Sequence, residues 1–192
     1  ATTEIYTLSL HDALPISVLQ RGFRLAGYSP AMRVAPLVFG PDGIDDRTVV
    51  VRLNQAQDCN GASTVAAGGI ATNTYRHHPH AEAGRGTITC EGSGAGAAEM
   101  VLVEGVEGFR VLYGLDEDDD DVPERYVPHT EVGPANAGAV AALRFALLVT
   151  SGEPIRTRDK AETHVLLDTT VDTNDRIARS VFASTVKLRN RR

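Results

Sequence analysis

The sequence lacks any apolar run long enough to cross a lipid bilayer, for which a helix needs about 20 apolar residues. The best candidate, Ala139–Val149, is too short and contains Arg144. The first residues also lack a basic segment followed by an apolar one, which is the pattern of a signal peptide. The sequence as given therefore predicts neither a membrane anchor nor an export signal.

Basic residues are fewer than acidic ones, with 19 Lys and Arg against 25 Asp and Glu and a net charge of −6. A nucleic-acid-binding face needs a basic surface that displaces counterions, so we expect no nucleic acid to be bound directly. Catalytic signatures are missing too: there is no Gly-x-Ser-x-Gly, no His-Glu-x-x-His and no Gly-x-x-x-x-Gly-Lys. The sequence therefore predicts that the protein is not an enzyme.

The composition that is present is that of an ordinary globular domain. Hydrophobic residues make up 42% and charged residues 23% of the 192 residues, which suits one domain with a core. The start differs in character, because Glu4–Ile16 resembles the peptide obtained when a sequencing adapter is translated as coding DNA. We therefore interpret residues 1–17 as an artefactual segment and 18–192 as a single globular domain, and expect the true N-terminus to be missing.

Hydrophobic periodicity predicts one helix and several strands. Val18–Tyr28 has the pattern of a helix end, with apolar residues at three- and four-residue spacing and Gly27 as a stop. Strands are predicted at Thr48–Leu53, Thr87–Cys90, Val101–Val103, Phe109–Leu115, Arg125–Val127, Leu143–Val149 (after a short helical entry) and Ser180–Leu188. The connections include the weakly patterned Ser63–Asn73, the flexible linker Glu91–Ala98 and the polar excursion Ser151–Arg176. Hairpin-like connections favour an α+β fold with an antiparallel sheet.

The stretch Met100–Val127 contains the most distinctive pattern of the chain. Alternate residues from Phe109 to Leu115 fall on one face of a strand, and six consecutive acids, Asp116–Asp121, follow it. Six adjacent carboxylates cannot enter a core, so we expect them at a solvated hairpin tip. Asp116, Asp118 and Asp120, spaced two apart, could converge on a hard cation such as Ca²⁺ if the loop curls; the alternative is a solvated tip without an ion.

Two further clusters carry weaker predictions. His77, His78 and His80 could bind Zn²⁺, but partners at helical spacing are missing and the segment has the pattern of a loop, so no functional metal site is predicted there. Cys59 and Cys90 would form one disulfide in an exported protein and two free thiols in a cytosolic one. The cysteine count leaves both alternatives open.

Several segments gain meaning from their order and spacing along the chain. They are Arg24–Tyr28, the cysteine sites Asp58–Gly61 and Thr89–Gly92, the central pieces Val103–Glu107 and Val111–Gly114 with the acidic loop and Arg125–Val127, and the closing segments Leu143–Ser151 and Val181–Asn190. Together they resemble the PilW family of type IV pilus minor pilins, from about Val18 to the C-terminus. The family often has Asp-x-Asp-Gly-Asp-Gly in the acidic loop, where this chain places Asp119 and Asp121 at the glycine positions.

This resemblance implies a pilin-like head, with an antiparallel sheet and an N-terminal helix that is truncated here. It also implies a Cys59–Cys90 disulfide and a structural role in which the protein packs with other major and minor pilins and pilus assembly components. The intact protein would lie at the inner membrane, in the periplasm and in the pilus, anchored through the missing part of the helix. The alternative function is a Ca²⁺-stabilised extracellular binding module or adhesin in which the acidic loop is the working part.

Overall fold

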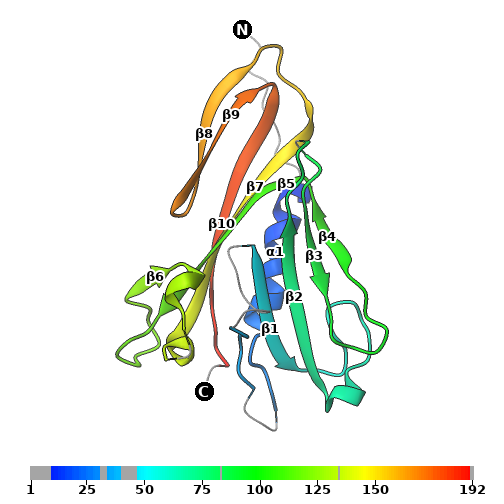
Figure 1. Cartoon of the computed structure of the whole chain (residues 1–192), viewed down its shortest axis with the longest axis vertical. Coiled ribbons are helices and arrows are strands. Elements are labelled where there is room, and N and C mark those ends of the chain that lie inside the picture. Colours follow the sequence, from blue (N-terminus) through cyan, green and yellow to red (C-terminus); the bar gives the residue numbers. More distant parts are fainter. Residues whose placement is uncertain (1–9, 31–33, 40–46, 83, 134, 191–192) are drawn as a thin grey trace.

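A computed structural model of the chain describes residues 10–30, 34–39, 47–82, 84–133 and 135–190. Within these residues it has one α-helix, ten strands and three 3-10 helices (Figure 1). The elements are α1 (Leu10–Arg24), β1 (Thr48–Asn54), η1 (Val65–Ala67), β2 (Ile70–His78), β3 (Thr87–Glu91), β4 (Met100–Glu104), β5 (Val106–Leu115), β6 (Arg125–Val127), η2 (His129–Glu131), η3 (Ala137–Ala139), β7 (Val140–Pro154), β8 (Lys160–Leu166), β9 (Thr169–Asp175) and β10 (Ile177–Lys187). No helix in this described part of the chain is long and apolar enough to cross a membrane.

The strands form two four-stranded antiparallel sheets and a separate hairpin. The first sheet has the order β1-β2-β3-β4, so its strands are neighbours in sequence as well as in space. The second sheet has the order β10-β7-β5-β6 and pairs the centre of the chain with its C-terminal part. Strands β8 and β9 form the hairpin, which lies at the upper left of Figure 1. The predicted antiparallel arrangement is confirmed, but as two sheets rather than one.

Helix α1 packs between the two sheets. Its buried residues Leu19 and Phe23, with the buried Ala26 in the turn that follows, have the spacing that predicted a helix end here. The ring of Phe23 meets Tyr75 of the first sheet and Phe145 of the second edge-on, with centroids 5.3 Å apart in both pairs. A single aromatic side chain of the helix therefore joins the cores of both sheets.

The chain leaves α1 through a tight turn. Gly27 has φ +75°, and a Cβ there would lie 2.3 Å from the backbone oxygen of Asn190, so glycine is required for two reasons. The helix starts at Leu10 and therefore runs through the boundary predicted at Ser17. Ile16 is partly buried against the core. The foreign origin of residues 1–17 stays a prediction.

The central strands bury the face that their alternation predicts. Phe109, Val111, Tyr113 and Leu115 of β5 are all buried in the main core cluster. Strand β7 pairs with β5 on one side and β10 on the other, and is almost wholly buried from Val140 to Leu148. The predicted strand Leu143–Val149 is therefore the buried centre of a longer strand, and a single 3-10 turn, η3, takes the place of the helical entry.

Two strand regions differ from the prediction. Strand β2 covers part of the weakly patterned segment and also His77 and His78, which were predicted in a loop. The excursion Ser151–Arg176 contains the hairpin β8–β9. Leu166, at its tip, packs on Ala146 and Leu148 of β7. The guanidinium of Arg110 donates to both carboxylate oxygens of Asp168 at 2.7 Å, so the polar hairpin is held onto the outer face of the second sheet.

Candidate functional site

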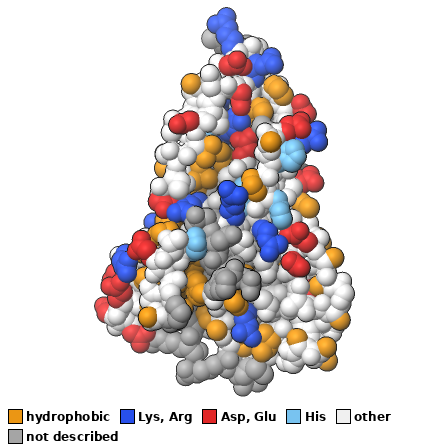
Figure 2. Space-filling model, viewed as in Figure 1, with side chains coloured by type: hydrophobic (Ala, Val, Ile, Leu, Met, Phe, Trp, Pro, Cys, Tyr) orange, Lys and Arg blue, Asp and Glu red, His pale blue; other side chains and the backbone are white. Residues whose placement is uncertain are grey.

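The acidic loop joins β5 to β6 at the edge of the second sheet. Figure 2 shows acidic side chains gathered at the lower left, where Figure 1 places β6. The prediction that all six acids are solvated is wrong for Asp116, which is only 4% exposed. Its Oδ1 accepts the backbone N–H of Asp120 at 3.1 Å, and its Oδ2 accepts that of Asp121 at 3.0 Å. Asp116 is therefore buried because its carboxylate caps two backbone N–H groups of the loop that follows.

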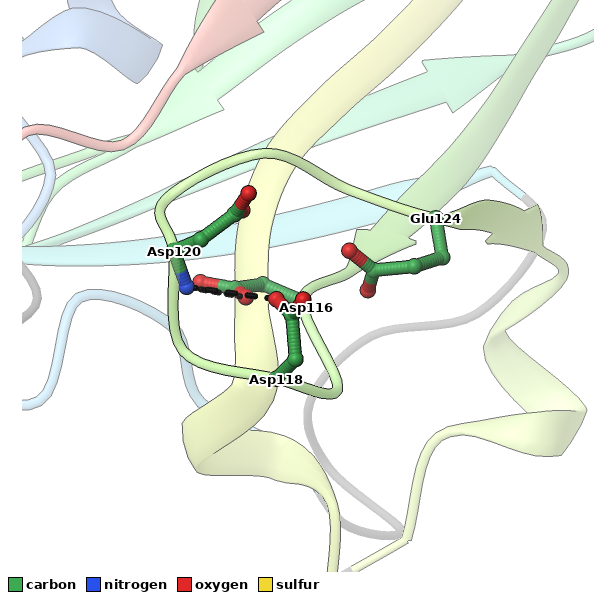
Figure 3. A group of neighbouring side chains, drawn as sticks. All are labelled: Asp116, Asp118, Asp120 and Glu124. Atoms are coloured by element: carbon green, nitrogen blue, oxygen red, sulfur yellow. Dashed lines mark hydrogen bonds between the residues drawn. The ribbon is translucent and has the colours of Figure 1, made fainter.

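The three carboxylates predicted to converge do come together, and a fourth joins them. Asp116, Asp118, Asp120 and Glu124 each offer an oxygen, and these four atoms lie within 4.8 Å of one another (Figure 3). The cluster could hold a metal ion. The sequence also contained a signal for Glu124, because this residue comes directly before the return strand that begins at Arg125. The return of the chain places Glu124 beside Leu115, whose backbone oxygen accepts the N–H of Glu124 at 2.9 Å.

The backbone of this loop takes up an unusual conformation at two of its acids. Asp119 and Asp121 have φ values of 68° and 70°, in the left-handed region that glycine adopts most easily. These are the two positions at which the PilW resemblance leads one to expect glycine. The loop therefore has the curl of a glycine-containing loop, but it reaches that curl with aspartates.

Crowding of like charges affects the titration of the loop. Partial desolvation, followed by the negative charge of Asp120, raises the pKa of Asp118 above its ordinary value. Arg125 lies at the far end of the loop and donates to Glu117 at 2.8 Å and to Glu131 at 3.2 Å. This arginine offsets the charge of two acids outside the cluster, so the four clustered carboxylates still repel one another.

The histidines do not converge. His77 faces the core, where its Nε2 lies 3.0 Å from the backbone oxygen of Val106, and burial lowers its pKa. His78 faces the other side of β2, 2.7 Å from Glu99 Oε1. His80 accepts the N–H of Glu82 through Nδ1 at 3.0 Å. The acidic loop is the one group with metal-ligating geometry that was found among the described residues.

Cys59 and Cys90 form a disulfide, the pairing that the family resemblance implies. The neighbouring Asp58 is 7% exposed and accepts three backbone N–H groups: Asn60 at 2.9 Å, Ala62 at 3.0 Å and Gly94 at 2.7 Å. The bond from Gly94 fixes a segment that was predicted to be a flexible linker. The segment is an irregular connection between β3 and β4, as predicted, and a carboxylate distant in sequence holds its backbone at Gly94.

A comparison of folds defines the class of protein. The chain is similar to a solved structure, a type IV-like pilin from Thermus thermophilus, with a TM-score of 0.56 and 22% sequence identity over 93% of this chain and 94% of that chain. The domain therefore has a pilin-like fold, with antiparallel sheets and one N-terminal helix, and the predicted fold class is confirmed.

The sequence itself identifies the family. A family model described as type IV pilus-assembly protein W, PilW, matches residues 73–190. This match covers more than half of the chain, and the protein belongs to the PilW family of type IV pilus-assembly proteins. No curated protein matches the chain. Membership of this family indicates a pilus-related structural role at the cell envelope or in the pilus.

Proposed function

We propose that this protein is a minor pilin-like component of type IV pilus biogenesis that acts by packing against other pilin subunits. The observation that carries the proposal is the pilin-like fold of a chain that belongs to the PilW family. In this role the domain lies on the periplasmic side of the inner membrane before assembly and in the pilus afterwards. Its work is done by surfaces that bind protein, and it requires no catalytic group.

The side of the domain formed by α1 and β4 is the packing surface that we favour. Strand β4 is an edge of the first sheet, and α1 lies against it. Val101 on this strand is 50% exposed, its neighbour Met100 is 42% exposed, and Val18 on α1 is 39% exposed. Exposed apolar side chains on a free sheet edge and on the helix beside it are available for contact with another protein.

The test combines a gene deletion with a matched pair of substitutions. We expect deletion to reduce the number of pili per cell, counted by electron microscopy, and the intact gene to restore it. Val101→Glu should fail to restore pili, whereas Val165→Glu, at a valine that is 58% exposed on the β8–β9 hairpin, should restore them. Unchanged pilus numbers in the deletion strain would contradict the assembly role. The reverse result for the two variants would contradict only the choice of surface.

A second proposal concerns the acidic loop, which we infer binds Ca²⁺. Oxygen ligands lie about 2.3–2.6 Å from Ca²⁺, so opposite ligands are up to about 5 Å apart. Four oxygens within 4.8 Å of one another can therefore be shared by one such ion. A cation would also relieve the repulsion among four carboxylates.

Calorimetry and thermal unfolding in CaCl₂ test this site. We expect heat of binding and a higher Tm for the wild-type chain and for Asp159→Asn, a control at an exposed acid outside the loop. Both signals should disappear in Asp118→Asn/Asp120→Asn. If Ca²⁺ gives neither heat nor a rise in the wild-type Tm, the site does not exist. Normal pilus numbers in the deletion strain, together with a loss of Ca²⁺-dependent adhesion, would favour the binding module or adhesin instead.

A further inference from the structure

A groove of about 260 Å³ separates α1 from the disulfide. Val18 and Gly22 of α1, with Leu25 in the turn that follows, line one side; Cys59 in the β1–β2 connection, with Asn73 and Tyr75 of β2, lines the other. Cys59 is partly exposed, whereas Cys90 is completely buried. We therefore expect a small thiol reagent that enters the groove to approach the disulfide from the side of Cys59.

The disulfide is linked to Tyr75 by two routes. In the register between β2 and β3, Cys90 lies directly opposite Tyr75. On the other side, the backbone N–H of Cys59 donates to Asn73 Oδ1 at 3.0 Å. Asn73 lies two residues before Tyr75 on the same buried face of β2, and both side chains border the groove. Both Asn73 and Tyr75 are buried, at 6% and 4% exposure, although they border the groove.

Tyr75 in turn is the residue of the first sheet on which α1 packs, or is seated. A Cβ on Gly22 would lie 2.2 Å from the Tyr75 hydroxyl oxygen, so the helix passes directly over that hydroxyl. The next residue, Phe23, packs edge-on against the Tyr75 ring at an interplanar angle of 80°. The other side of the helix is held by the second sheet, through Phe145 and through a 2.6 Å hydrogen bond from Gln20 to Ser184. Movement of Tyr75 would therefore release one side of α1 and leave the other attached.

We propose that the redox state of the Cys59–Cys90 disulfide controls how firmly α1 is seated, with Asn73 and Tyr75 as the positioning residues that connect the two. A dithiol reductant supplies the electrons. Its thiolate attacks Cys59 Sγ, the bond to Cys90 breaks, and Cys90 leaves as a thiolate that takes up a proton. The second thiol of the reductant then displaces Cys59, which is also protonated, and the reductant becomes a disulfide. This device does not depend on the pilus role.

Hydrogen exchange on the full chain, followed by mass spectrometry, tests the coupling. We compare oxidised protein, protein reduced with dithiothreitol and protein reoxidised after removal of the reductant. Reduction should speed amide exchange in Leu19–Arg24 roughly tenfold, since loss of one or two hydrogen bonds changes local opening by about this factor. Exchange in the β8–β9 hairpin, which packs on the second sheet, should stay unchanged, and reoxidation should restore α1. Faster exchange confined to the two cysteine segments, or equal acceleration everywhere, would overturn the proposal.

Variants that keep the disulfide separate the coupling from general destabilisation. Asn73→Ala cuts the contact to Cys59 and leaves the pairing of Cys90 with Tyr75, so α1 should already exchange faster in the oxidised protein. Reduction should then add clearly less than the wild-type acceleration, because one of the two routes is already broken. Thr74→Ala is the matched control on the other face of β2, and it should behave as the wild type does. If reduction accelerates α1 in Asn73→Ala as much as it does in the wild type, Asn73 does not connect the disulfide to the helix.

Discussion

The loop beside the disulfide, residues 58–62 (the disulfide loop), and the acidic loop are both organised by a buried aspartate. They differ in the other interactions that stabilise them. Asp58 in the first and Asp116 in the second are both buried aspartates that accept backbone N–H groups of the residues that follow. The disulfide loop adds a covalent bond and places glycine, Gly61 with φ 79°, where the backbone turns left-handed. The acidic loop has aspartates at its left-handed positions and like charges around them. The disulfide loop is therefore stabilised by its own bonds, whereas the acidic loop is strained unless a cation offsets its negative charge.

The largest expected effect is at the covalent bond. The disulfide joins residues 31 apart in sequence, and by loop entropy Cys59→Ser/Cys90→Ser should lower the free energy of unfolding by about 4 kcal/mol. Urea unfolding of the variant and the oxidised wild type gives this value. A loss below about 1 kcal/mol would mean that Asp58 alone closes the loop, which would remove the contrast between the two regions.

The two capping aspartates give the next largest difference. Asp58→Ala leaves three part-buried N–H groups without their acceptor and should cost about 3 kcal/mol in unfolding free energy. Asp116→Ala leaves two such groups but also removes one crowded charge, so we expect a loss of only about 1 kcal/mol. Equal losses in urea unfolding would show that charge repulsion in the acidic loop is unimportant.

Exchanging glycine and aspartate at left-handed positions tests the strain directly. Asp119→Gly and Asp121→Gly should each raise the unfolding free energy by about 0.5–1 kcal/mol, because glycine adopts a positive φ without steric cost. Gly61→Asp should lower it by a similar amount, about 0.5–1 kcal/mol. A Cβ on Gly61 meets nothing within 4 Å, so this substitution reports backbone strain without a clash. Thermal unfolding that ranks the variants in any other order would contradict the assignment of strain.

The smallest effect is the pH dependence of the acidic loop. Because the pKa of Asp118 is raised in the folded state, the folded protein binds protons more tightly at this carboxyl than the unfolded chain does. Its contribution to stability is present below the ordinary pKa of 3.8 and is lost as pH rises through the raised folded pKa. Asp118→Asn should therefore gain stability relative to the wild type as pH rises through this range, as measured by Tm at a series of pH values. A Tm difference that is independent of pH would show that the charge on Asp118 is not what opposes folding.

Much of the fold follows from local pattern. The spacing of Leu19 and Phe23 identifies the inward face of α1, and the alternation from Phe109 to Leu115 identifies the buried face of β5. Both patterns are visible because apolar side chains face a core and polar ones face water. The three clustered aspartates were found for a similar reason, since the loop they occupy is short and their spacing is regular.

The features that were missed depend on contacts between distant residues. Strand β2 buries the polar residues Asn73 and His77, which find hydrogen-bond partners at Cys59 and Val106, so its inward face does not look apolar. The β8–β9 hairpin packs through few apolar residues and is fixed by the ion pair from Arg110, which lies 58 residues from Asp168. Periodicity within a short window contains no information on such partners.

The order of the strands has a consequence for how the chain is made. The first sheet is complete at Glu104, whereas the second lacks its edge until β10 near the C-terminus has emerged. Until β7 supplies Phe145, the ring of Phe23 lacks one of its two edge-on aromatic contacts, and the side of the helix that faces the second sheet is exposed. A newly synthesised chain must therefore protect an unfinished core through the whole central part of its length, which makes release of a truncated product a route to aggregation.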